Sequence, residues 1–95
     1  MALASSKSVT VSSQTQSDHI YLEPGEWVLM ITASGWGVVV PQVGDGSTFM
    51  TVQDSNGDIS LTANRSIVVA GGMCYRLNVT TYSQPVTLSA FRSKN

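Results

Sequence analysis

Charge is scarce in this chain. Asp, Glu, Lys and Arg make up 12% of its 95 residues, and the net charge is −1, whereas about 25% of the residues in a globular protein are usually charged. The five basic residues are dispersed along the sequence, so none of its segments offers the basic patch that nucleic acid or an anionic membrane surface attracts. We therefore expect no nucleic acid and no membrane among its partners.

Long apolar runs and cysteine pairs are missing too. The longest apolar run without Gly or Pro is Trp27–Ile31, far shorter than the ~20 residues that cross a bilayer as a helix. Residues 1–7 lack the basic and apolar regions of a signal peptide. A single cysteine excludes an internal disulfide, and we interpret Cys74, which lies between Met73 and Tyr75, as a small packing residue.

The sequence also lacks the motifs of the common catalytic and metal sites. His19 is the only histidine, and no Gly-x-Ser-x-Gly elbow is present, so a serine triad has no components to assemble. Asp54–Asp58 resembles part of a calcium loop, but it lacks the glycine at the sixth position from Asp54 and the glutamate at the twelfth that such a loop requires. We predict a surface position for His19, no metal, no cofactor and no enzymatic activity.

Strand-length apolar segments separated by turn residues are what the sequence does contain. The turns fall at Pro24–Gly25, Gly35, Gly44–Gly46, Asn56–Gly57 and Gly71–Gly72, and no segment carries a helical apolar period over three turns. This pattern predicts an all-β fold. We expect an antiparallel β-sandwich of jelly-roll type, with eight or nine short strands and no significant helix.

The strongest predicted strand is Glu26–Ala33. Trp27, Leu29 and Ile31 share one face, and the opposite face is also apolar, so we expect a central strand covered on both sides. Trp27 should lie in the core and Trp36 should be less buried. Asn56–Gly57 favours a hairpin with a type I′ turn, which needs positive φ at both central residues.

A carbohydrate-binding platform is an alternative use of the aromatic residues. Trp27 and Tyr75 fall in phase with the core, which leaves Trp36, Tyr21 and Tyr82 as candidates for stacking against a sugar.

The chain divides into an arm and one domain. Residues 1–8 are rich in Ser and poor in apolar area, so we predict a flexible arm over 1–8 and a single β-sandwich domain over 9–95. The predicted strands carry few of the charges that usually protect sheet edges, which favours self-association over a monomer with a neutral surface. We expect the arm to add to a partner's sheet edge, and the candidate partner-contact residues are Ala2, Leu3, Ser5, Ser6, Lys7, Ser8 and Trp36.

Several short motifs between residues 25 and 92 resemble those of a known group of proteins. This arrangement resembles the small β-sandwich structural proteins of tailed bacteriophages, many of which decorate the capsid. The motifs, in chain order, are Glu26–Trp27, Trp36–Gln42, Asp45–Phe49, Asn56–Gly57, Ser66–Val69 and Gly71–Leu77.

The resemblance implies a viral structural protein. It suggests a capsid decoration (cement) protein that forms a homotrimer, binds the major capsid protein at the capsid surface of the virion and stabilises the head after synthesis in the host cytoplasm. It supplies no catalytic residues and no cofactor. The alternative is a receptor- or glycan-binding module of a phage tail or fibre.

Overall fold

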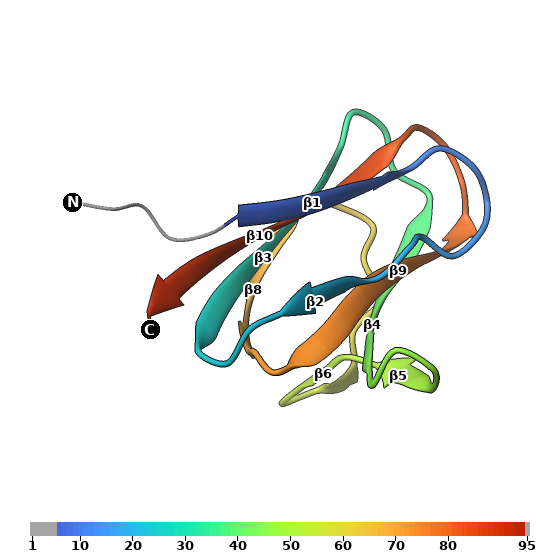
Figure 1. Cartoon of the computed structure of the whole chain (residues 1–95). Helices are drawn as coiled ribbons and strands as arrows, with labels where there is room; N and C mark the ends of the chain where they lie inside the picture. The colour runs from blue at the N-terminus through green and yellow to red at the C-terminus, as the bar shows by residue number, and fades with distance from the viewer. Residues whose placement is uncertain (1–5, 95) are drawn as a thin grey trace.

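The computed structural model describes residues 6–94, which form ten strands. Among these residues there is no helix, and so none that could cross a membrane. Two four-stranded sheets face each other (Figure 1). In spatial order, the first sheet contains β1 (Ser6–Val11), β10 (Val86–Lys94), β3 (Glu26–Ala33) and β8 (Arg65–Ala70). The second sheet contains β2 (Ile20–Leu22), β9 (Met73–Thr81), β4 (Val38–Gly44) and β5 (Phe49–Thr51).

The strands pair as a long hairpin that has been rolled up. β1 pairs with β10, β2 with β9, β3 with β8 and β4 with β5, and every pair is antiparallel. The pairs β10–β3 and β4–β9 then complete the two sheets. The predicted antiparallel β-sandwich without helix is confirmed, with ten strands in place of eight or nine. The jelly-roll type stays a prediction at this point.

The core lies between the two sheets and follows the alternation of the strands. Trp27, Leu29 and Ile31 of β3 are fully buried, as are Leu77 of β9 and Leu88 of β10. Among the described residues, no charged side chain is buried, and the Tyr75 hydroxyl in the core donates a hydrogen bond to the Ala70 carbonyl oxygen at 2.7 Å. The Trp27 Nε1 group donates a hydrogen bond to the Glu23 carbonyl oxygen at 2.8 Å, so the largest core residue leaves no polar atom unpaired. The predicted core position of Trp27 is confirmed.

The outer face of β3 corrects one expectation. This strand is central, with β10 and β8 as neighbours, but only its inner face is covered. Met30 is 42% exposed, and Val68 opposite Val28 is 64% exposed. Burial within one copy of the chain therefore does not account for the apolar residues on the outer face of β3.

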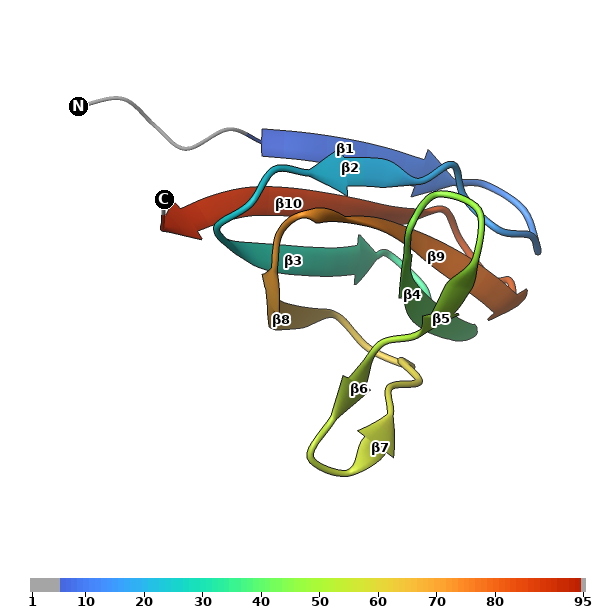
Figure 2. The ribbon, with the colours of Figure 1, turned by 60° about the horizontal axis from the view of Figure 1, so that its bottom comes forward.

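The β6–β7 hairpin corrects a second expectation. It lies outside the sandwich (Figure 2) and joins β6 (Gln53–Asp54) to β7 (Gly57–Asp58). Because Asp54 pairs with Gly57, the turn residues are Ser55 and Asn56, one position earlier than predicted. Only Gly57 has positive φ, at 104°, and the Asp54 side chain accepts a hydrogen bond from the Asn56 N–H. These are the features of a type I turn with Asp first and Gly last, not of type I′.

The first strand begins inside the predicted arm. Ser6, Lys7 and Ser8 pair with Phe91, Ala90 and Ser89 of β10, so these residues belong to the domain and the predicted arm boundary at residue 8 is wrong. The backbone of Ser6–Ser8 is paired with the chain's own sheet on the β10 side. The rest of the predicted arm, with Ala2, Leu3 and Ser5, lies outside the described residues.

Candidate functional site

The outer face of the second sheet brings together residues from distant parts of the sequence. Tyr21 of β2 lies opposite Cys74 of β9, Cys74 opposite Gly44 of β4, and Gly44 opposite Phe49 of β5. Opposed residues of antiparallel strands project to the same face. One row therefore crosses all four strands, and in the next row Gln42 of β4 lies opposite Arg76 of β9.

The turn between β4 and β5 is tight because of one glycine and one aspartate. A Cβ atom at Gly44 would lie 1.9 Å from the Thr48 carbonyl oxygen, so the backbone approach requires glycine. The Asp45 Oδ1 atom accepts hydrogen bonds from the N–H groups of Ser47 and Thr48, each at 2.8 Å. These bonds, first that of Thr48, lower the pKa of Asp45 because they stabilise its charged form.

The same turn folds back over the sheet. Gly46 has a φ of +100°, and a Cβ atom placed on it would lie 3.8 Å from the Cys74 sulfur and 3.9 Å from His19 Nε2. The turn therefore covers Cys74, which is only 8% exposed although it is outside the core cluster. The predicted packing role of Cys74 agrees with this position.

Phe49 is the centre of the site. The Arg76 guanidinium carbon lies 3.9 Å from the centroid of its ring, as a cation–π contact requires. The Arg76 Nε atom donates a hydrogen bond of 2.7 Å to Gln42 Oε1. The His19 ring lies 5.7 Å from the Phe49 ring at an interplanar angle of 41°. Three segments that are far apart in sequence thus meet at one aromatic ring.

His19 reaches this ring because the segment before β2 follows the edge of β9. The Ser17 N–H donates to the Leu77 carbonyl oxygen at 2.8 Å, and the Ser17 hydroxyl accepts from the Leu77 N–H at 2.9 Å. Ile20 then pairs with Tyr75. With both sides anchored, His19 lies over the second sheet, and its side chain is exposed as predicted.

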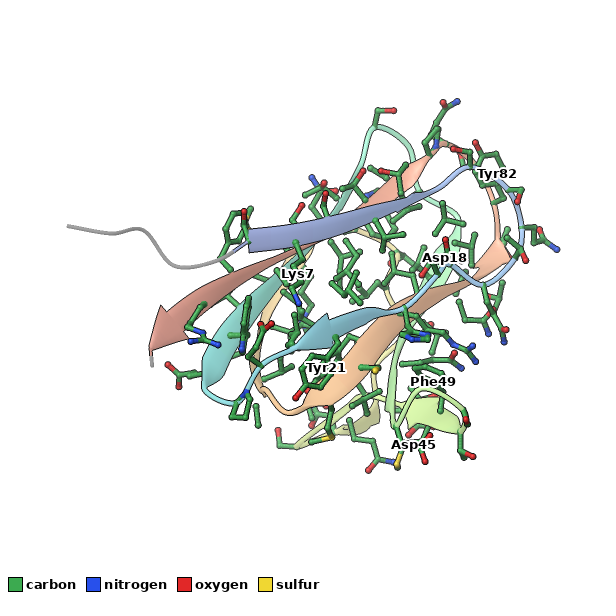
Figure 3. The ribbon with its side chains drawn as sticks, in the orientation of Figure 1. Lys7, Asp18, Tyr21, Asp45, Phe49 and Tyr82 are labelled. Carbon is green, nitrogen blue, oxygen red and sulfur yellow. The ribbon has the colours of Figure 1, made fainter. Side chains whose placement is uncertain are left out.

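A surface hollow adjoins Phe49. Its volume is about 390 Å³, within the ~300–1,000 Å³ usual for small-molecule sites. Figure 3 shows Phe49 and Asp45 together beside β5, with Tyr21 on β2 beyond them. The hollow is lined by Val43, Gly44, Asp45, Thr48, Phe49, Met50, Gly72 and Met73. Phe49 therefore borders both the largely apolar hollow and the polar cluster formed by Arg76, Gln42 and His19.

The predicted partner-contact residues that the structure describes lie elsewhere. Lys7 donates to the Tyr21 carbonyl oxygen and forms a 3.3 Å ion pair with Glu23, which ties β1 to β2. Trp36 is half-buried against the core, as predicted, and its Nε1 group donates to Asn64 Oδ1 at 2.8 Å. Neither residue contributes to the cluster around Phe49.

The three predicted sugar-stacking aromatics do not come together. Tyr21 lies opposite Cys74 near the start of β9 and is 46% exposed. Tyr82 follows the end of β9 and packs against the core, so the length of β9 separates the two tyrosines (Figure 3). Within residues 6–94, no three side chains of His, Cys, Asp or Glu gather as a metal site would need.

Sequence reasoning missed Phe49, Arg76 and Gln42. Each residue alone is unremarkable, and their meeting depends on the register of β5, β4 and β9. The available signal was the phase of Arg76, which projects outward from a strand whose alternate residues are core, together with the Asp45–Phe49 turn.

Comparison with known proteins gives a fold and no family. No protein-family model matches this chain, and no curated protein matches it. A solved structure that does match is NovW, a 4-keto-6-deoxy sugar epimerase from the novobiocin biosynthetic gene cluster of Streptomyces spheroides. The identity is 17% and the TM-score 0.51, and the match covers 94% of this chain but 45% of NovW. This likeness extends to the fold alone, and the chain spans less than half of that protein.

The NovW match corrects two predictions made from the sequence. The shared fold is that of an enzyme acting on a sugar, and no comparison points to a phage structural protein. The prediction of a capsid decoration protein in a virion is therefore wrong, together with its alternative as a module of a phage tail or fibre. The prediction that excluded enzymatic activity is wrong as well.

Proposed function

We propose that this chain is a sandwich of jelly-roll type that binds a sugar on the outer face of its second sheet. The rolled-hairpin pairing supports the jelly-roll assignment, since this fold is built from two Greek keys and occurs in lectins and cupins. The observation that carries the binding function is the cluster at Phe49, with Arg76 at 3.9 Å and His19 at 5.7 Å beside the 390 Å³ hollow.

The chemistry of this cluster fits a sugar. A sugar ring presents C–H groups that pack against an aromatic ring and hydroxyl groups that need fixed donors and acceptors. Phe49 supplies the ring, Arg76 and Gln42 supply donors, and the Asp45 carboxylate in the wall of the hollow supplies an acceptor. All four residues lie on the sheet or its tight turn, so little side-chain or loop ordering remains for binding to offset.

Nuclear magnetic resonance titration tests this function. Glucose, galactose, mannose, rhamnose and glucuronate are added separately to the ¹⁵N-labelled chain while the backbone amide signals are followed. We expect at least one sugar to shift the amides of Phe49, Thr48 and Arg76 in a saturable manner. If none of these sugars moves those signals at millimolar concentration, the proposed function is overturned.

The chain supplies a matched control for the ring. It contains two phenylalanines, and Phe91 lies on the outer face of the first sheet, where it is 42% exposed. Phe49→Ala should weaken sugar binding at least tenfold because the stacking surface is lost. Phe91→Ala should leave binding unchanged, and equal losses in both variants would place the sugar elsewhere.

Catalysis on a sugar is a second candidate, favoured by the match to an epimerase and by the exposed His19 imidazole. Epimerisation next to a carbonyl begins when a base removes the neighbouring carbon-bound proton, and His19 is the chain's only histidine. A 4-keto-6-deoxy sugar incubated with the chain in D₂O should then gain deuterium at that carbon. Exchange no faster than with His19→Asn would reject catalysis by His19 and leave sugar binding untouched.

A further inference from the structure

Arg76 is held in place from two directions, yet its hydrogen-bonding capacity is mostly unused. Its guanidinium carbon lies over the Phe49 ring, 3.9 Å from the ring centroid, and its Nε atom donates a hydrogen bond to Gln42 Oε1 at 2.7 Å. Within residues 6–94, neither terminal nitrogen has a hydrogen-bond partner, and no carboxylate lies within ion-pair distance. Four N–H donors therefore remain available on a guanidinium whose orientation is fixed.

Three other basic residues, Lys7, Arg65 and Arg92, behave differently. Lys7 pairs with Glu23 at 3.3 Å, Arg65 with Asp54 at 3.1 Å, and Arg92 with Glu23 at 3.9 Å. Arg76 is half-buried without such a partner. Burying part of a charge costs free energy unless an opposite charge compensates it. A cation that is fixed, partly desolvated and unpaired is complementary to an anion that arrives with a ligand.

We propose that the sugar bound at this site carries an oxyanion, which the terminal nitrogens of Arg76 bind in a bidentate manner. This inference rests on the proposed function and adds the chemical class of the ligand. A carboxylate and a phosphate both present two oxygens that match the guanidinium fork. The carboxylate could be that of a uronic acid, and the phosphate that of a sugar phosphate, so the site takes an acidic sugar of one of these two kinds.

The negative charge of Asp45 in the wall of the hollow does not prevent an anionic ligand from binding at Arg76. Asp45 is the acidic residue among the lining residues, and its Oδ1 atom accepts two N–H groups of its own turn at 2.8 Å. Its negative charge is thus partly balanced by those backbone dipoles. His19, whose ring lies 5.7 Å from that of Phe49, places a further N–H donor on the same side of the sheet.

Three matched probes test the charge. Glucose, glucuronate and glucose 1-phosphate share one ring and differ in the presence and kind of oxyanion. We expect glucuronate or glucose 1-phosphate to bind at least tenfold more tightly than glucose and to shift the Arg76 Nε–H signal. The tighter of the two identifies the oxyanion. Raising the salt concentration should weaken the binding of the acidic probe and leave the binding of glucose unchanged, because salt screens the attraction between the oxyanion and Arg76.

Two variants separate charge from geometry. Arg76→Gln should reduce the affinity for the acidic probe to that for glucose. Arg76→Lys keeps the charge but loses the planar fork, so it should recover less than half of the preference in free energy. Arg65→Gln is the control, because Arg65 pairs with Asp54 away from the site, and it should change neither affinity.

The outcomes distinguish this inference from the function on which it rests. Equal affinity for glucose and both acidic probes overturns the oxyanion and leaves a neutral sugar site. An acidic preference that survives Arg76→Gln overturns the role of Arg76. Absence of binding for all three probes, together with the neutral sugars above, overturns both proposals.

Discussion

The two outer faces of the sandwich share one pleat and differ in chemistry. On the first sheet, two rows of opposed residues hold only hydroxyl and apolar side chains, namely Ser6, Phe91, Val28 and Val68 in one and Ser8, Ser89, Met30 and Ser66 in the next. A third row adds Thr10, Thr87 and Thr32, with a 3.1 Å hydrogen bond between the first two. Glu26 marks the border of this neutral face.

On the second sheet, the corresponding face carries Phe49 with Arg76, Gln42 and His19 around it. A turn folds over part of this face and adds Asp45 at its edge. The difference separates two kinds of recognition. A neutral face can meet a second copy of itself without placing like charges together, whereas a fixed aromatic ring with unused donors is suited to a small polar ligand.

The largest effect on stability should come from the hydrophobic core, which lies between the two sheets and supports both outer faces. Trp27→Ala removes the largest fully buried side chain of the core, and such a cavity costs about 3–5 kcal/mol. This is a large share of the ~5–15 kcal/mol that stabilises a small domain. Urea denaturation followed by circular dichroism measures the loss, with Phe91→Ala as the outer-face control. Equal stability of the two variants would mean that the inner and outer faces of the first sheet are wrongly assigned.

The core was the part of the fold that the sequence predicted best. Trp27, Leu29 and Ile31 alternate with residues of the opposite face, and period two is a property of a single strand that needs no knowledge of its neighbours. The bounds of Glu26–Ala33 are accordingly the observed ones. The β6–β7 turn was misplaced by one residue because Gly57 suits the last position of a type I turn as well as a type I′ turn.

The site was not predictable in the same way. Phe49 and Arg76 meet across β4, so their contact depends on two strand registers and on the absence of a side chain at Gly44. The open outer face of β3 was also missed, because an apolar face looks the same in sequence whether it packs inside one copy or against another. Periodicity reports which residues share a face, but not what covers that face.

Self-association stays a prediction, and the neutral face of the first sheet is where we expect it. Val68→Lys introduces a charge at its most exposed large apolar residue, which is 64% exposed, and should weaken association at least tenfold, about 1.4 kcal/mol. Met50→Lys, at a residue of β5 in the second sheet that is 60% exposed, is the control. Sedimentation velocity over a range of concentrations measures both.

The stoichiometry sharpens this prediction. Contact between two copies of the same face closes as a twofold dimer, whereas the trimer predicted from the sequence needs two different surfaces. A trimer that Val68→Lys leaves intact would move the contact to the sheet edges. A chain that sediments as a monomer at every concentration would contradict self-association through either surface.

A smaller effect should follow from loosening the turn over the second sheet. Asp45→Ala removes the acceptor for the Ser47 and Thr48 N–H groups, so the turn should open more often and uncover Cys74, which lies beneath Gly46. We expect a thiol reagent to label Cys74 several-fold faster in this variant than in the unmodified chain. Asp54→Ala removes the same kind of cap from the β6–β7 turn and should leave the labelling rate unchanged. Equal acceleration in both variants would indicate general loosening.

The smallest effect should be a titration at acid pH in the two turns that Asp45 and Asp54 cap. The outer face of the first sheet should not show it. Hydrogen bonds from the backbone N–H groups of Thr48 and Ser47 hold the pKa of Asp45 below its ordinary value of 3.8, and the N–H of Asn56, with Arg65, does the same for Asp54. A lowered pKa means that each carboxylate stabilises the fold above pH 3.8 and that this contribution disappears as the pH falls through the lower folded value. Amide signals followed from pH 6 to pH 2 should therefore show Thr48 and Asn56 titrating with midpoints below 3.8, while Ser89 on the neutral face stays constant. A Thr48 midpoint at or above 3.8 would contradict the Asp45 cap, and in Asp45→Asn the Thr48 titration should vanish while that of Asn56 persists.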